Sequence, residues 1–202
     1  SPRDPPPNLY LRPMTGGEER LHKSPLQSWA TGWSPDGRFL VYWLLDPKTK
    51  QDLWVLPLSG DRKPAPFLQT SFNEAAGRVS PDGKWMAITS DESGRNEIYV
   101  TSFPAPGRKW RISTDGGSQP QWGRDGKELF YRAPESKLLA VGVTPGPSFD
   151  AGVPRELFQA PPGSGSYVAA ADGQRFLVSV EIAKPTPPPV QVVVHWTAGL
   201  RR

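Results

Sequence analysis

The sequence predicts an all-β protein assembled from repeated units, and three observations support this prediction. First, the 202 residues include 25 prolines and 20 glycines, which disfavour long helices because each destabilises a helix interior. Second, eight tryptophans, eight phenylalanines and five tyrosines supply bulky side chains that suit β-strands. Third, Asp-Gly pairs recur at near-constant spacing, with the aspartates at positions 36, 82, 125 and 172 lying 46, 43 and 47 residues apart. A period of this length is typical of repeat architectures.

These four regularly spaced Asp-Gly pairs are expected to form tight hairpin turns. Proline sets the first corner of such a turn, aspartate accepts hydrogen bonds from neighbouring amides, and glycine adopts the positive φ that closes it. The pairs are Asp36-Gly37, Asp82-Gly83, Asp125-Gly126 and Asp172-Gly173. The first two belong to complete Ser-Pro-Asp-Gly sequences, whereas Gly123-Arg124 and Ala170-Ala171 precede the later two.

Short apolar runs on both sides of each turn predict four antiparallel strands per unit. First strands end at Trp33, Val79 and Trp122. Second strands are expected at 39–43, 85–88, 129–131 and 176–180; third strands at 53–56, 98–100, 138–141 and 192–194; and fourth strands at 67–68, 110–112 and 157–158. Four strands per ~45 residues predict the blades of a β-propeller. Apolar side chains at both odd and even positions predict strands covered on both faces by neighbouring blades.

We expect one propeller domain of about four and a half blades over residues 1–202. Its units are 1–24 (partial), 25–70, 71–114, 115–160 and 161–202. At the start, Asn8–Leu11 matches the third-strand pattern of Asp52–Val55, and Arg20-Leu21 falls where a fourth strand would lie. The last unit offers a first strand near Tyr167–Ala169 and a third at Gln191–Trp196, but no fourth.

This arrangement leaves open strand edges, which need pairing partners. The N-terminal half-blade could close the ring, or a second copy could supply the pairing. We favour self-association.

Composition excludes several classes of function. Lys and Arg outnumber Asp and Glu by only 24 to 20, and the surplus is spread along the chain, so we expect no nucleic-acid partner. Zero cysteines exclude disulfides and thiolate metal ligation, and no apolar run approaches the ~18 residues of a membrane span. His22 and His195 are far apart in sequence, and the oxygen-rich loop Ser90–Glu97 lacks the ligand spacing of a calcium loop. We therefore expect no metal, no cofactor and no direct membrane insertion.

The sequence Trp33–Gly37, followed by an aliphatic strand and then by a polar–aliphatic–aromatic–aliphatic strand, resembles the TolB-like, WD-type propeller repeats of bacteria. Val79–Gly83 departs from this pattern only in its first residue, and the resemblance covers about residues 8–200. The ending Val192–Leu200 looks like the closing strand of propellers that follow bacterial serine/threonine kinase domains.

The resemblance implies a non-catalytic module that binds a protein or small-molecule ligand, as the sensor or scaffold part of a larger receptor-like kinase or TolB-like protein. It also implies an extracytoplasmic location. The absence of cysteine is compatible with this location and equally with a cytoplasmic one. The alternative is the substrate-gating propeller of a prolyl-peptidase-like serine hydrolase. The chain carries neither kinase signatures nor a Gly-x-Ser-x-Gly elbow, so we expect no catalytic residues within it.

Candidate ligand-binding residues lie just upstream of the turns, because the innermost strand of each propeller blade lines the central channel. These segments offer Trp29, Asn73, Glu74, Arg78, Gln119 and Gln121. Arg78 and Gln121 occupy equivalent positions, one residue before Val79 and Trp122, and are predicted to face the channel as a polar pair. Trp33 and Trp122 are expected to pack between blades.

Overall fold

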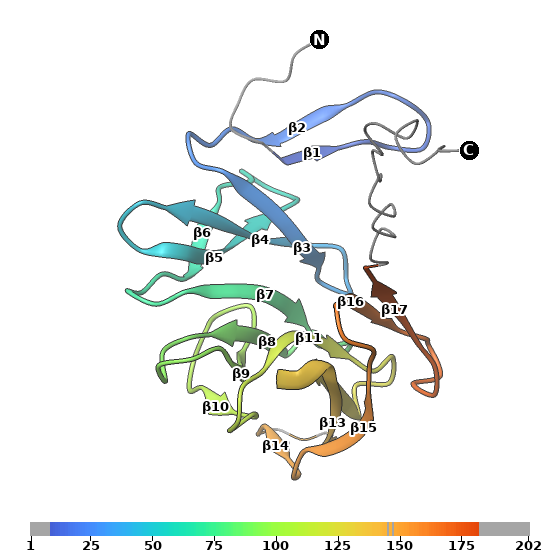
Figure 1. Ribbon diagram of the computed structural model, residues 1–202. Helices are drawn as coiled ribbons and strands as arrows, with labels where there is room; N and C mark the ends of the chain where they lie inside the picture. Colours follow the sequence, from blue (N-terminus) through green and yellow to red (C-terminus); the bar gives the residue numbers. More distant parts are fainter. Residues whose placement is uncertain (1–8, 145, 147, 182–202) are drawn as a thin grey trace, which may run out of the picture.

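The protein consists of antiparallel sheets that stack one after another as propeller blades (Figure 1). The structure, a computed structural model, describes residues 9–144, 146 and 148–181. Blade 1 pairs, in order, β3 (Ser28–Trp33), β4 (Phe39–Asp46), β5 (Lys50–Pro57) and β6 (Ala65–Leu68). Blade 2 pairs β7 (Glu74–Val79), β8 (Trp85–Ser90), β9 (Glu97–Ser102) and β10 (Trp110–Arg111). Blade 3 pairs β11 (Ser118–Trp122), β12 (Glu128–Arg132), β13 (Lys137–Thr144) and β15 (Arg155–Gln159).

Two-stranded sheets lie at both ends of the described chain. The N-terminal hairpin pairs β1 (Leu9–Leu11) with β2 (Glu19–His22), and blade 4 pairs β16 (Ser164–Ala169) with β17 (Phe176–Val180). The third strand expected at 191–196 lies outside the described residues. The prediction of an all-β propeller with antiparallel blades is confirmed.

Blade 3 differs from the expected four strands by an additional short strand, β14 (Asp150–Ala151). The reason is the length of β13: its beginning pairs with β15, whereas Val143 and Thr144 at its end pair with Ala151 and Asp150. A 3-10 turn at Pro134–Ser136 connects β12 to β13. The repeat pattern of the sequence predicts neither β14 nor this 3-10 turn.

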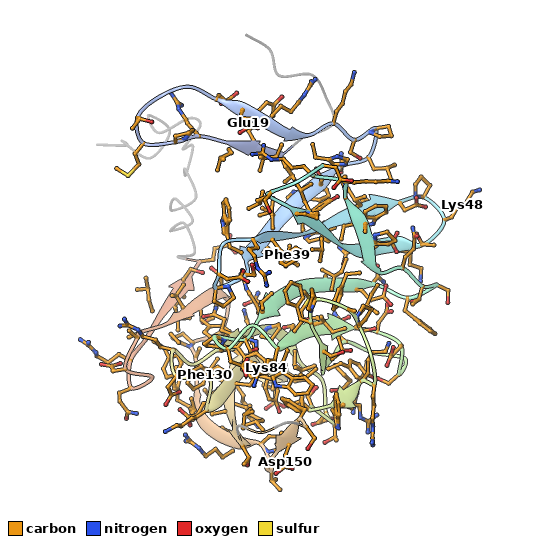
Figure 2. All side chains as sticks on the ribbon, turned by 180° about the vertical axis from the view of Figure 1, so that it is seen from behind. Glu19, Phe39, Lys48, Lys84, Phe130 and Asp150 are labelled. Atoms are coloured by element: carbon orange, nitrogen blue, oxygen red, sulfur yellow. The ribbon has the colours of Figure 1, made fainter. Side chains whose placement is uncertain are left out.

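The core consists of layers between successive blades. In β4, the buried side chains of Leu40 and Tyr42 pack on the N-terminal hairpin, whereas Val41 packs on Met86 and Ile88 of blade 2. Strand β4 is therefore covered on both faces, as its apolar pattern predicted. Phe39 and Phe130, both labelled in Figure 2, belong to the layers that join blade 1 to blade 2 and blade 3 to blade 4.

The predicted turn chemistry is confirmed at the four regularly spaced Asp-Gly pairs. Gly37, Gly83, Gly126 and Gly173 have φ values of 70°, 72°, 73° and 66°. In the first turn, the Ser34 hydroxyl donates to Asp36 Oδ1 at 2.5 Å and accepts from the Phe39 amide at 3.0 Å. Because Asp36 accepts from this hydroxyl, and also from Arg38, its pKa is lowered to about 2.

Candidate functional site

The innermost strands of all four blades share one irregularity. Pairing with the second strand shifts register between Ala30 and Gly32 in β3, and at the equivalent places in β7, β11 and β16. In β7 and β11 the bulge includes a non-glycine residue with positive φ, 54° at Ala76 and 55° at Gln119. A bulge re-aims the side chains that follow it, which here are those nearest the Asp-Gly turns.

At this turn end of the strands lies an open depression of about 530 Å³, which we call the turn-side mouth. All four blades contribute to its wall, and the lining residues are Pro35, Arg78, Val79, Pro81, Gln121, Trp122, Gly123, Arg124 and Val168. The wall contains two arginines and no acidic residue. The predicted polar pair, Arg78 and Gln121, is thus brought together in one site.

Arg78 is an exposed side chain that reaches toward blade 1. Its Nη1 lies 3.2 Å from the position that a Cβ on Gly32 would take, so the guanidinium occupies space left by this glycine. The carbonyl of Arg78 accepts a hydrogen bond of 2.9 Å from Trp122 Nε1, which ties blade 3 to β7. Burial of part of the side chain lowers the pKa of Arg78, but an arginine stays charged at neutral pH.

Arg124 stands at the proline position of its turn, equivalent to Pro35 and Pro81. It is exposed, and within the described residues neither Arg124 nor Arg78 makes a side-chain hydrogen bond or ion pair. The turn carboxylates nearby bind groups of their own turns: Asp82 accepts from the Ser80 hydroxyl and the Lys84 amide, and Asp125 accepts from the Lys127 amide. Arg124 was missed by the sequence reasoning, although its departure from the Ser-Pro pattern was an available signal.

Gln121 lines the mouth but its amide joins two blades. Its Nε2 donates to the Tyr167 carbonyl at 2.5 Å, and its Oε1 accepts from the Ala169 amide at 3.2 Å. The side chain therefore pairs with β16 much as a peptide group of a neighbouring strand would. Arg78, at the equivalent position in blade 2, makes no such hydrogen bonds to a neighbouring blade. Its side chain is therefore more available to a ligand than that of Gln121.

The remaining predicted residues lie outside the turn-side mouth, toward the starts of the innermost strands. Trp29 is 36% exposed and stacks on Trp43 with ring centroids 4.0 Å apart. Asn73 Nδ2 donates to Asp91 Oδ2 at 2.6 Å, and the Gln119 carbonyl accepts from the Tyr167 hydroxyl at 2.9 Å.

The sequence predicts Glu74 to be exposed at a channel mouth, but in the structure Glu74 is fully buried. The Thr70 hydroxyl donates to its Oε1 at 2.5 Å, whereas its Oε2 has no hydrogen-bond partner among the described residues. Burial raises the pKa of Glu74 above the ordinary value of 4.5. The cause is that β7 begins at Glu74 itself, so this residue belongs to a blade rather than to an open loop.

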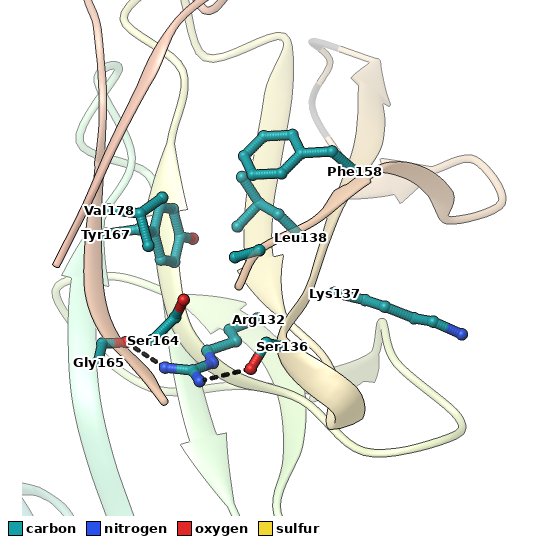
Figure 3. A pocket seen from close by; sticks show the side chains of 10 residues that line it. Arg132, Ser136, Lys137, Leu138, Phe158, Ser164, Gly165, Tyr167 and Val178 are labelled. Carbon is teal, nitrogen blue, oxygen red and sulfur yellow. Dashed lines mark hydrogen bonds between the residues drawn. The ribbon is translucent and has the colours of Figure 1, made fainter. Parts of the chain in front are cut away.

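A second cavity lies between blades 3 and 4, where Figure 3 shows Arg132 reaching toward Gly165 and Ser136. The Arg132 guanidinium donates to the Gly165 carbonyl and, at 3.1 Å, to the Ser136 hydroxyl. The cavity measures only about 10 Å³, which is the room of roughly one water molecule. It is a packing gap between blades and too small for an organic ligand.

Within the part of the chain that the structure describes, no group of three or more His, Asp or Glu side chains is arranged to hold a metal ion, and no helix is long and apolar enough to cross a membrane.

Comparison with solved structures supports a TolB-like β-propeller. TolB from Acinetobacter baumannii superposes with a TM-score of 0.67 and 20% identity over 85% of this chain and 42% of its own. A putative TolB from Agrobacterium tumefaciens gives 0.59 and 20% identity, over 71% of this chain and 55% of its own. A periplasmic gluconolactonase from Pseudomonas aeruginosa gives 0.51 and 16% identity, over 84% and 55%. At these identities the likeness establishes the fold alone.

Comparison with curated sequences gives partial matches. An uncharacterized protein of Agrobacterium fabrum is 30% identical over 115 residues, which is 54% of this chain and 33% of that protein. Dipeptidyl-peptidase 5 of Aspergillus fumigatus is 29% identical over 119 residues, covering 54% of this chain and 15% of the enzyme. No family model matches the sequence. The chain thus spans a third or less of the curated relatives it matches.

Proposed function

We propose that this chain is a non-catalytic binding module that takes its ligand at the turn-side mouth. The observation that carries this proposal is the mouth itself, a depression of about 530 Å³ to which all four blades contribute. Its volume falls within the ~300–1,000 Å³ of known ligand pockets, and its two arginines make no hydrogen bond or ion pair within the described chain.

The chemistry of the mouth favours a carboxylate-bearing ligand. Arg78 and Arg124 present fork-shaped donors that match a carboxylate, and the wall offers no acid to neutralise them. Trp122 and Val168 add apolar surface, which a short peptide would cover with its aliphatic groups. Because the depression is open rather than enclosed, an acidic segment of a partner protein fits it better than a small molecule does.

The test is a binding titration with a fluorescein-labelled peptide of four aspartates in a glycine background, measured by anisotropy. Arg78→Ala and Arg124→Ala should each weaken binding by about 10- to 100-fold, because a charge-assisted hydrogen bond contributes ~1.5–3 kcal/mol. Arg111→Ala is the matched control, since Arg111 is an exposed arginine on β10, outside the mouth. The asparagine version of the peptide should bind as weakly as the variants do.

Equal weakening by Arg111→Ala would reduce the effect to general charge attraction and would count against a site at the mouth. Binding that is unchanged in both mouth variants would place the ligand elsewhere on the propeller.

The wider role we propose is the sensor or scaffold part of a larger bacterial receptor-like kinase or TolB-like protein. The TolB-like fold supports the second, and the resemblance of Val192–Leu200 to the closing strand of kinase-linked propellers supports the first. An extracytoplasmic location belongs to the same proposal, with the periplasmic gluconolactonase among the fold neighbours as its support. The complete reading frame of the gene tests it: a kinase domain and a membrane span upstream are the expected result.

A second candidate is the substrate-gating propeller of a prolyl-peptidase-like serine hydrolase. The match to Dipeptidyl-peptidase 5 over 119 residues favours it. A hydrolase domain with a Gly-x-Ser-x-Gly elbow in the same reading frame would establish this candidate in place of the first.

A further inference from the structure

The innermost strands of the four blades carry equivalent residues one position before their ends. These residues are Gly32, Arg78, Gln121 and Val168, and each pairs with the fourth residue after the turn glycine of its own blade. Arg78, Gln121 and Val168 line the turn-side mouth. Blade 1 therefore has a glycine where each of the other three blades has a side chain at the mouth.

The backbone conformation of Gly32 does not require glycine. Its φ lies outside the left-handed region, in which other residues would be strained. A glycine within a strand also destabilises the fold relative to alanine, because glycine loses more conformational freedom on folding and has no side chain to pack. The reason for a glycine at this position therefore lies in what surrounds it.

One side-chain atom lies close to Gly32, and it belongs to Arg78. Apart from the chain neighbours of Gly32, Arg78 Nη1 is the only described atom within 4 Å of the place that a Cβ would take, at 3.2 Å. This distance is shorter than an ordinary van der Waals contact, so a side chain at position 32 would displace the guanidinium. Gly77, by contrast, is enclosed by buried core side chains. The space beside Gly32 thus serves Arg78 rather than the core.

Arg78 is held at both its backbone and its guanidinium. Its carbonyl accepts the 2.9 Å hydrogen bond from Trp122 Nε1 of blade 3, and its guanidinium lies against Gly32 of blade 1. An unrestrained arginine samples many rotamers and loses this freedom when it binds a ligand. An arginine whose side chain already has a defined place loses less on binding. The contact with Gly32 therefore prepares the guanidinium for a ligand.

We propose that Gly32 is a positioning residue of the turn-side mouth, because its lack of a side chain lets the Arg78 guanidinium lie against blade 1 in the place where it meets the ligand carboxylate. This inference rests on the proposed function, in which Arg78 binds that carboxylate. It adds that the affinity of the mouth depends on a residue with no functional group of its own. A larger residue at position 32 should weaken binding although Arg78 itself is unchanged.

The test applies the titration with the labelled tetra-aspartate peptide to a double-mutant cycle of positions 32 and 78. Gly32→Leu should weaken binding by about 10-fold or more, approaching Arg78→Ala, and Gly32→Ala should act more weakly in the same direction. In the Arg78→Ala background, Gly32→Leu should change the affinity by less than about twofold, because the guanidinium that it displaces is no longer there.

Gly142→Leu is the matched control for the added side chain. Gly142 lies in β13, outside the mouth, and a Cβ there would meet no described atom within 4 Å. This variant should bind the peptide like the unmodified chain. Circular dichroism of Gly32→Leu should also match that of the unmodified chain, because the added carbon meets only a flexible side chain.

A second measurement follows the guanidinium in the absence of peptide. The Nε–H resonance of Arg78, assigned from its loss in Arg78→Ala, should show a more restricted side chain in the unmodified chain than in Gly32→Leu, by relaxation on the ps–ns timescale. Arg111, an exposed arginine outside the mouth, provides the reference for an unrestrained guanidinium. Equal mobility of Arg78 in both proteins would overturn the inference.

The binding outcomes separate this inference from the proposed function. If Arg78→Ala weakens binding and Gly32→Leu does not, Gly32 does not position the arginine, and the proposed function stands. If Gly32→Leu weakens binding equally with and without the Arg78 side chain, leucine obstructs the ligand directly, and the inference is again overturned. If Arg78→Ala leaves binding unchanged, the proposed function fails and the inference fails with it.

Discussion

Replacing Gly83 by alanine isolates the energetic requirement of the Asp-Gly turns. Gly83 has a φ of 72°, and a Cβ added there would meet no atom within 4 Å, so the cost of the substitution is conformational rather than steric. The left-handed region costs an L-residue ~1–2 kcal/mol. Alanine also restricts the unfolded chain, which offsets ~0.4–1 kcal/mol of this cost. The expected net loss is therefore ~1 kcal/mol, rising to ~1–3 kcal/mol for Gly83→Val because of its branched side chain.

Gly142 provides the matched control for this prediction. A Cβ at Gly142 would also meet nothing within 4 Å, but Gly142 lies in β13 without a positive φ. Gly142→Ala should therefore stabilise the protein by ~0.5–1 kcal/mol, through the unfolded chain alone. Urea unfolding of both variants gives the comparison, and a loss of ~1 kcal/mol corresponds to a fall of ~2–4 °C in Tm for a chain of this size. If Gly83→Ala is as stable as Gly142→Ala, the turn does not impose the strain that its φ implies.

Three other predictions test the blades and their buried groups. Burial raises the pKa of Glu74, so the folded state holds this proton more tightly than the unfolded state does, and the free energy of unfolding falls as pH rises from about 4.5 through the raised value. Glu74→Gln should remove this fall. The prediction is contradicted if urea unfolding gives the same difference in free energy between variant and wild type at pH 5 and at pH 7. Gln121→Ala removes two hydrogen bonds to β16 and should cost ~1–3 kcal/mol, with faster hydrogen exchange at the Ala169 amide; unchanged exchange there would show that the side chain does not join the blades. Addition of EDTA should leave Tm unchanged, and a drop of about ten degrees in a thermal melt would reveal a metal site in the Ser90–Glu97 loop.

The sequence alone determined the features that depend on local chemistry. The Asp-Gly pairs predicted the hairpins because positive φ at a tight turn needs glycine, and the structure has it at Gly37 and Gly83. The apolar runs predicted where strands lie, since a strand buried on both faces has few polar positions. Even the N-terminal hairpin was predicted at Asn8–Leu11 and Arg20-Leu21, close to β1 and β2.

Only the tertiary structure decided what the side chains near the channel do. Arg78 and Gln121 occupy equivalent positions, yet Gln121 binds the backbone of β16 whereas Arg78 extends over Gly32, because the blade beside each residue offers a different surface. Glu74 seemed a loop carboxylate in the sequence, but the packing of blade 2 buries it. The contacts of Arg78 and Gln121 depend on residues about 45 positions away in a neighbouring repeat, and a local pattern holds no information about which of them comes into contact.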